Sequence, residues 1–325
     1  MSEKAILFIH ALTGLHPGSG TALGVVDLPV QRERHTHWPT IPGSTLKGVL
    51  RDACREKVRS NYHAELDEQG RVKRTPRRRA NEDDAELTAV FGPGTVDAGS
   101  SYSGALSLTD ARILAFPVRS LKGVFAWVTC PDVLDRLNRD IGLIGYSNTV
   151  NFTKPAKNEA LCATTEGDHP LLVDGNKLVL EEFEFTRTGS ADGPAAWIAE
   201  RAVQDKATQE RIKVHLVVLH NDPFTDFVRH ATEVVARIGL DYERKTVKSG
   251  ALFYQEFLPP ETLFYSVVIA ESSRRDGTDM DASSVLKYLR DSLPSYIQIG
   301  GDETIGKGLC ALRLLNKQDL GKQEK

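Results

Sequence analysis

One aspartate, Asp27, stands in a segment that is otherwise suited to binding anions, VVDLPVQRERHTHW at residues 25–38. The other ionisable side chains of this segment are Arg32, Glu33, Arg34, His35 and His37. An aspartate beside an RNA 2′-hydroxyl can act as a general base, or can hold a divalent ion that activates the hydroxyl. A lone loop aspartate more often caps a turn. The residue by itself therefore leaves open whether Asp27 is catalytic or a turn residue.

Histidines accompany Asp27 in the same loop. His16 precedes it, while His35 and His37 follow at a spacing of two residues. Imidazole binds metal ions and transfers protons near neutral pH, but this pair has no neighbouring Cys or Asp that would complete a zinc site. No second carboxylate lies at helical spacing to Asp27 either, so the sequence does not predict a two-metal centre.

A second candidate for anion binding is the segment IPGSTLKG at residues 41–48. Pro42 and Gly43 are expected to turn the chain, and Ser44 is expected to cap a helix. Free backbone N–H groups and the helix dipole make such a start suited to a phosphate. Lys47 in the first turn opposes the dipole at a cost of a few tenths of a kcal/mol, which mildly favours a bound anion over a plain capped helix.

A glycine-rich segment, GGDETIGKG at residues 300–308, is the third candidate. Its stretch from Gly301 to Lys307 fits the spacing GxxxxGK, but a P-loop needs Ser or Thr next and then a helix. Gly308 occupies that position and a strand follows, so an NTP-binding P-loop is excluded. The remaining possibilities are a plain hairpin turn, or a flexible loop with Thr304, Gly306 and Lys307 that approaches a nucleic-acid backbone.

The segment RKTVKSGALFYQEFLPPETLFY (244–265) combines a basic start, paired aromatic residues and Glu256. This pattern is typical of a β-hairpin whose apolar residues stack on bases or wedge between them. It equally fits a core strand followed by a turn at Pro259–Pro260.

Strands and helices that alternate irregularly must position these segments. The pattern predicts strands at 4–13, 104–116, 123–130, 177–185, 213–219, 263–270, 296–300 and 309–315. It predicts helices from Ser44 to Val58 and at 131–140, 225–240 and 282–293, a long loop at 14–43, and a frayed tail from 316. This mixture favours an α+β fold with a ferredoxin-like core and large insertions.

Composition excludes several classes of protein. The 325 residues carry a net charge of −3, so the chain as a whole is not a basic nucleic-acid binder. No apolar run is long enough to span a membrane, and the four cysteines form neither a zinc motif nor a disulfide framework, which predicts a reduced, cytoplasmic setting. The basic run RVKRTPRRR (71–79) is either a solvated loop or a nucleic-acid contact.

Four stretches together resemble a known family. They are HPGSGTALGVVDLPVQRERHT, IPGSTLKGVLRDACRE, SGALSLTDARILAFPVRSLKGVFAWVTCP and IQIGGDETIGKGL. They look like the backbone subunit of the type III-B (Cmr) CRISPR effector complex, a member of the RAMP superfamily. The resemblance covers about 1–58, 100–152 and 225–315. The helix start and the glycine-rich loop are shared across the superfamily, whereas GVVDLPVQRERHT is specific to this subunit.

The resemblance implies one RAMP domain over 1–325. Its ferredoxin-like (RRM-like) palm would comprise about 1–58, 100–140 and 225–315, with insertions at about 60–100 and 141–220. A thumb β-hairpin would lie at 241–258 or, alternatively, within 177–219. Copies of such subunits stack into a filament along one guide CRISPR RNA, together with other Cmr subunits, and cut the paired single-stranded target RNA at regular intervals as part of antiviral defence.

The resemblance also implies roles for single residues. The family's catalytic aspartate matches Asp27, which would work with a divalent ion such as Mg²⁺ or Mn²⁺, and its loop histidine and late glutamate match His16 and Glu256. The residues expected to contact RNA are Arg32, Arg34, Ser44, Lys47, Gly301, Thr304, Gly306 and Lys307.

Three other functions are distinguishable from this one. A structural RAMP subunit would bind the guide RNA and cut nothing, whereas an enzyme that processes guide precursors would act alone and without a metal. A ferredoxin-like regulatory module would bind a small molecule, and nothing in the sequence supports that once the P-loop is excluded.

Overall fold

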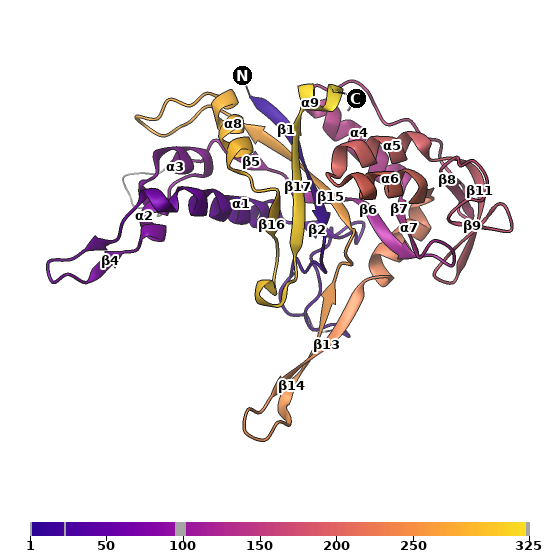
Figure 1. The fold of residues 1–325 in the computed structure, drawn as a ribbon, viewed down its shortest axis with the longest axis horizontal. Helices are drawn as coiled ribbons and strands as arrows, with labels where there is room; N and C mark the ends of the chain where they lie inside the picture. The colour runs from indigo at the N-terminus through magenta and orange to yellow at the C-terminus, as the bar shows by residue number, and fades with distance from the viewer. Residues whose placement is uncertain (1, 23, 95–101, 323–325) are drawn as a thin grey trace.

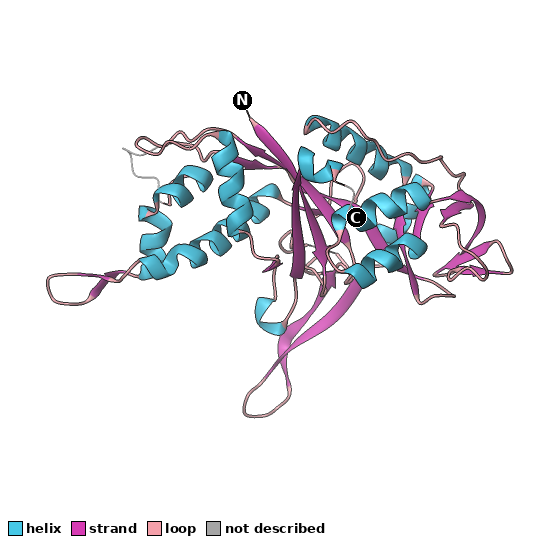
Figure 2. Ribbon diagram, turned by 45° about the horizontal axis from the view of Figure 1, so that its top comes forward, coloured by secondary structure: helices cyan, strands magenta, loops and turns pink. Residues whose placement is uncertain are grey.

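The centre of the molecule is a strand that is buried along most of its length, β1 (Glu3–Ala11). In the computed structural model, which describes residues 2–22, 24–94 and 102–322, β1 lies between two antiparallel neighbours, β15 (Leu263–Ala270) and β17 (Leu309–Asn316). A strand covered on one face alternates between buried and exposed residues. β1 does not alternate, because α1 (Gly43–Val58) and α8 (Ala282–Ser292) lie on one side of it and α5 (Asp192–Ala202) lies on the other (Figures 1 and 2).

The main sheet of the described residues has 13 strands, in the order β16-β17-β1-β15-β6-β7-β12-β8-β11-β10-β9, with β2 beside β6 and β5 beside β15. The strands not yet located are β2 (Thr40–Ile41), β5 (Leu106–Leu108), β6 (Ala111–Arg119), β7 (Phe125–Thr129), β8 (Glu159–Cys162), β9 (Leu172–Val173), β10 (Lys177–Leu180), β11 (Phe183–Ser190), β12 (Leu216–Leu219) and β16 (Tyr296–Gln298). The predicted α+β class is therefore confirmed, while the ferredoxin-like detail stays a prediction.

The remaining helices divide between the two sides of the sheet (Figure 1). On one side α2 (Pro76–Asp83) and α3 (Ala85–Phe91) pack beside α1, after a short turn η1 (Arg59–Asn61) and a small ribbon of β3 (Glu65–Leu66) and β4 (Val72–Arg74). On the other side lie α4 (Pro131–Leu143), α6 (Lys206–His215) and α7 (Asn221–His230). The segment 71–79 was expected to be a solvated loop or an RNA contact; it falls instead in β4, the start of α2 and the residues around them.

A two-stranded hairpin projects from the sheet. Its first strand occupies the second half of the segment 225–240, for which a helix was predicted. The helix α7 ends at His230, and β13 (Glu233–Leu240) pairs with β14 (Val247–Phe257) (Figure 1). Val234, Val235 and Ile238 fit a helical period, but all three are exposed in β13. Branched side chains favour strands, and pairing with β14 here decides against the helix. The candidate thumb at 241–258 thus covers the turn and the second strand of this hairpin.

Smaller differences follow from single turns. The strand predicted at 104–116 is divided into β5 and β6, and the strand predicted at 177–185 is divided into β10 and β11 at Glu181, whose φ is 48°. The tail from 316 does not begin frayed, because α9 (Lys317–Gly321) starts with a capping box between Asn316 and Asp319.

Candidate functional site

Three segments far apart in the sequence meet at the base of the hairpin (Figure 1). They are the Asp27 loop (residues 14–31), residues 254–257 of β14, and the glycine-rich loop (299–308), which contains η2 (Glu303–Ile305). The N–H of Leu28 donates to the carbonyl of Tyr254 and the N–H of Glu256 donates to that of Leu28, both at 3.0 Å. The N–H groups of Gly301 and Gly308 donate to the carbonyls of His16 (3.0 Å) and Gly14 (2.8 Å). Backbone hydrogen bonds therefore fix the mutual positions of all three segments.

Asp27 lies where its loop runs along the base of β14. Its Oδ2 accepts a hydrogen bond of 2.7 Å from the backbone N–H of Tyr254, and the residue is partly exposed. No hydrogen bond or ion pair from the described part of the chain reaches Oδ1. The carboxylate is thus held in place through one oxygen, and the other remains able to bind a ligand.

His16 is buried in the same junction. Its Nδ1 lies 2.6 Å from the carbonyl oxygen of Glu256, which can only accept, so Nδ1 carries a hydrogen and donates it. The ring packs on Phe257 at 5.6 Å between centroids, and the ammonium of Lys307 lies 4.9 Å from the centre of the Phe257 ring. Gly300 is required beside it, because its φ is 83° and a Cβ there would lie 2.3 Å from the His16 carbonyl oxygen.

Glu256, predicted to be catalytic, is buried and fully engaged by the protein. Its Oε1 accepts from Arg32 at 2.6 Å and from the Thr232 hydroxyl at 2.9 Å, and its Oε2 accepts from the Val30 N–H at 2.9 Å. These contacts join the Asp27 loop to the start of the hairpin, and the catalytic role of Glu256 stays a prediction.

Arg32, predicted to contact RNA, is bound to the protein itself in this structure. Besides Glu256, its guanidinium donates to the carbonyls of His37 at 2.8 Å and Val228 at 2.9 Å. A buried carboxylate requires a charged, hydrogen-bonded partner, and Arg32 fills that role for Glu256; its contact with RNA stays a prediction.

Arg34 differs from Arg32 because its side chain is exposed and forms no ion pair with the described part of the chain. The adjacent Glu33 is bound by the Arg136 guanidinium at 2.8 and 3.0 Å and by Thr36 at 2.7 Å. Burial raises the pKa of Glu33, but the hydrogen bonds from Thr36 and Arg136 outweigh it and hold the pKa below its usual value. Arg136 also lies over the Trp38 ring, which fixes this part of the chain to α4.

The helix start at 41–48 is built differently from the prediction. The helix begins at Gly43, so Ser44 is an exposed residue of the first turn and not its cap. The N–H of Gly43 donates to Oδ1 of Asp110 at 2.7 Å. The loop between β5 and β6 lies against the helix start, so its carboxylate already binds one of the amide groups that were expected to bind a phosphate.

Lys47 and Arg51 form a half-buried basic pair on α1. Lys47 donates to the carbonyl of Leu106 at 3.0 Å, and Arg51 donates to the side-chain oxygen of Asn81 at 2.9 Å. Burial lowers the pKa of both groups, and each is lowered further by a neighbouring cation. No ion pair links either one to a carboxylate of the described residues, so this face of α1 keeps its positive charge, and Lys47 remains the predicted phosphate contact.

In the glycine-rich loop, Thr304 and Gly306 are exposed, and Gly306 has a φ of 75° with open space around it. Sequence reasoning missed the neighbouring Asp302, which contacts Gln255 and Arg237 of the hairpin. Nothing in the local sequence relates these three residues, since the hydrogen bonds between them exist only after the hairpin and the loop have come together.

The structure also shows that two other charged regions are used by the protein itself. All basic residues of 71–79 except Arg71 form ion pairs within 60–94 or with α1: Lys73–Glu65, Arg74–Asp83, Arg77–Asp52, Arg78–Glu82 and Arg79–Asp83.

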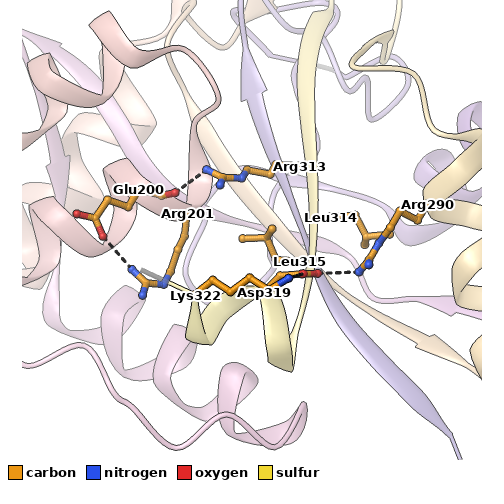
Figure 3. A pocket seen from close by; sticks show the side chains of 8 residues that line it. All are labelled: Glu200, Arg201, Arg290, Arg313, Leu314, Leu315, Asp319 and Lys322. Carbon is orange, nitrogen blue, oxygen red and sulfur yellow. Dashed lines mark hydrogen bonds and ion pairs between the residues drawn. The ribbon is translucent and has the colours of Figure 1, made fainter. Parts of the chain in front are cut away.

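A hollow of about 340 Å³ between α5, α8, β17 and α9 has four cations in its lining, Arg201, Arg290, Arg313 and Lys322 (Figure 3). Arg290 pairs there with Asp319 at 2.7 Å, and Arg313 donates to the carbonyl of Glu200, so this hollow serves to hold α5 and α9 against the sheet.

The described residues contain no group of three or more His, Cys, Asp or Glu that could hold a metal ion. Asp27 can supply one oxygen. Mg²⁺ is commonly held by one or two carboxylates together with substrate phosphates and water, so the site fits a divalent ion that arrives with RNA.

The RAMP superfamily model matches residues 8–311. The chain is 38% identical over 310 residues, 94% of each protein, to the CRISPR system Cmr endoribonuclease Cmr4 of Pyrococcus furiosus. The chain belongs to the RAMP superfamily and, within it, to the family of this Cmr endoribonuclease. A crystal structure of oligomeric Cmr4 from Pyrococcus furiosus matches 96% of this chain and 98% of its own, with a TM-score of 0.67 and 30% identity.

A cryo-EM structure of the type III-B Cmr-beta complex bound to cognate target RNA contains a chain with the same fold, at a TM-score of 0.69, 21% identity and 98% coverage of both chains. Among the residues described here, none of the helices has the length and apolar character that crossing a bilayer requires.

Proposed function

We propose that this chain is the backbone subunit of a Cmr-type CRISPR effector complex and the endoribonuclease that cuts its target RNA. It binds the backbone of a guide RNA, assembles in several copies with other Cmr subunits, and acts on single-stranded RNA paired with the guide. A cytoplasmic location follows from this role. The observation that carries the proposal is the position of Asp27: the backbone of Tyr254 holds it at the base of a projecting hairpin, on the same strand whose Glu256 carbonyl binds His16.

Cutting proceeds by attack of a 2′-hydroxyl on the adjacent phosphate. A base removes the 2′-hydroxyl proton, the new bond joins the 2′-oxygen to phosphorus, and the 5′-oxygen leaves and takes a proton. Asp27 has a carboxylate oxygen available for this step, and the neutral form of His16 carries its lone pair on Nε2, because Nδ1 donates to Glu256. Glu256 supports these two residues without contacting the RNA. Its three hydrogen bonds hold Arg32, Thr232 and the backbone of Val30 in place.

A divalent ion, when bound, supplies positive charge that stabilises the reacting phosphate and lowers the pKa of the attacking hydroxyl. Asp27 is the residue that would hold it, together with phosphate oxygens of the RNA. The glycine-rich loop, Lys47 and Arg34 bind the RNA backbone. Because backbone contacts do not depend on sequence, base pairing with the guide selects the target.

The test is Asp27→Asn in the assembled, guide-loaded complex. The asparagine oxygen still accepts from Tyr254 N–H, so the loop keeps its position, while the charge is lost. Cutting of a matched target should fall by about 100-fold or more, with guide binding and assembly unchanged. The control is a mismatched target, which neither complex should cut. Full-rate cutting by the assembled variant would show that Asp27 is not catalytic.

A further inference from the structure

The hairpin and the glycine-rich loop are tied together by three polar side chains. Gln255 on β14 donates from Nε2 to Oδ2 of Asp302 at 2.6 Å, and its Oε1 accepts from Arg237 on β13 at 3.2 Å. Arg237 in turn lies 3.3 Å from Oδ1 of Asp302. The three groups therefore form a closed ring of contacts, called here the base triad: Arg237, Gln255 and Asp302.

The base triad has one arrangement only. Arginine donates and never accepts, and an ionised aspartate accepts and never donates. The amide of Gln255 must therefore present its oxygen to Arg237 and its nitrogen to Asp302. Gln255 is 4% exposed, so water has little access to replace either bond. A buried network that is satisfied in this way fixes the geometry of the elements that carry it.

The position of the base triad connects it to the cutting site. The residues on either side of Gln255 hold the Asp27 loop: Tyr254 N–H donates to Asp27, and Glu256 N–H donates to the carbonyl of Leu28. Asp302 follows Gly301, whose N–H donates to the carbonyl of His16. The side chains of the triad thus join the two segments whose backbones hold Asp27 and His16.

We propose that the base triad is a positioning device that sets which phosphate of the target faces Asp27. The proposal rests on the function proposed above. The hairpin projects away from the sheet, and in the described part of the chain its outer end extends beyond the other elements (Figure 1). RNA held by the glycine-rich loop and RNA in contact with the hairpin keep a fixed offset only if the hairpin keeps a fixed angle to that loop. The triad fixes this angle through side chains, in addition to the backbone contacts of the Asp27 loop.

The experiment uses guide-loaded complexes assembled with Arg237→Gln, with Asp302→Asn, or with both. Asparagine tolerates the left-handed backbone at 302, where φ is 65°, so Asp302→Asn removes charge without straining the loop. Cut positions on an end-labelled target are mapped at single-nucleotide resolution, and single-turnover rates are measured. Each variant should cut at neighbouring phosphates in addition to the original one and should slow by roughly 10-fold or more. The double variant should be no slower than the slower single variant, because the groups act as a unit.

Lys248→Gln is the matched control, since it removes a positive charge from the same hairpin outside the triad; its cut positions should stay as in the unmodified chain. Unchanged cut positions in both single variants would overturn the proposal, and so would a slower rate at the original position alone, which is what a loss of stability would produce. If the chain were not the endoribonuclease proposed above, the unmodified complex would cut no target at all, and this result is distinct from those that overturn the role of the triad. Should one single variant fail to assemble, the cut map of the other decides.

Discussion

Two arginine-rich segments of this chain are similar in sequence and opposite in use. In 71–79, acidic residues of 52–83 form ion pairs with every basic side chain except Arg71, for example Arg78–Glu82 at 2.8 Å. In 32–34, Arg32 forms an ion pair with the buried Glu256, while Arg34 is exposed and forms no ion pair within the described residues. A similar density of basic residues therefore leaves different amounts of unpaired charge, and we expect RNA to bind where that charge remains. The useful quantity is the positive charge that remains after the chain's own carboxylates have taken their partners.

The largest effect expected from this comparison is on stability, at Arg32. Arg32→Ala leaves the carboxylate of Glu256 buried without its charged partner, and should lower the free energy of unfolding by about 3 kcal/mol. Chemical denaturation of the isolated chain measures it. In the double variant with Glu256→Gln the loss should be smaller, because no buried charge is then left unpaired. An equal or larger loss in the double variant would contradict this account of Arg32.

A smaller effect, on binding, is expected at Lys47. This ammonium donates to a backbone carbonyl and has no carboxylate partner in the described part of the chain. Lys47→Ala should weaken guide RNA binding and reduce the slope of log affinity against log salt by about 1. Titration of guide RNA at several salt concentrations measures both. An unchanged slope would show that Lys47 does not neutralise a phosphate.

The smallest effects separate the two arginine-rich segments directly. Arg34→Ala should weaken RNA binding modestly and reduce the salt slope, with no change in stability. Arg78→Ala should leave RNA binding unchanged and cost about 0.5 kcal/mol or less, as exposed i,i+4 ion pairs do. The same salt titration and the same denaturation curve serve both variants. If Arg78→Ala weakened RNA binding as much as Arg34→Ala, the comparison would fail.

The sequence predicted the elements of the core well, because burial dominates there. β1, β15 and β17 lie close to their predicted ranges, and α1 and α8 begin within a residue or two of theirs. The prediction failed in the second half of 225–240, where valines and isoleucine at helical spacing form the strand β13 of the hairpin. Apolar spacing predicts a helix only where the apolar residues are buried against the protein, and these residues of β13 are exposed.

The candidate site was predicted in part. The sequence pointed to Asp27, His16 and Glu256, and the structure brings all three to the base of the hairpin. It did not separate their roles, since Arg32 reaches Glu256 across 224 positions of the chain and Val228 across 196. It also gave no sign that Asp110 would bind the start of α1 in place of an anion.

The sequence by itself determined the buried strands, the glycines that permit tight loops and the motifs that place the chain in its family, because each depends on residues close together in the chain. Only the tertiary structure decided which charges are neutralised within the protein, which remain available to RNA, and how the hairpin joins the glycine-rich loop through Gln255. Charges are paired in space rather than along the chain, and the partners of Arg32, Lys47 and Gln255 come from distant segments that meet only in the folded protein.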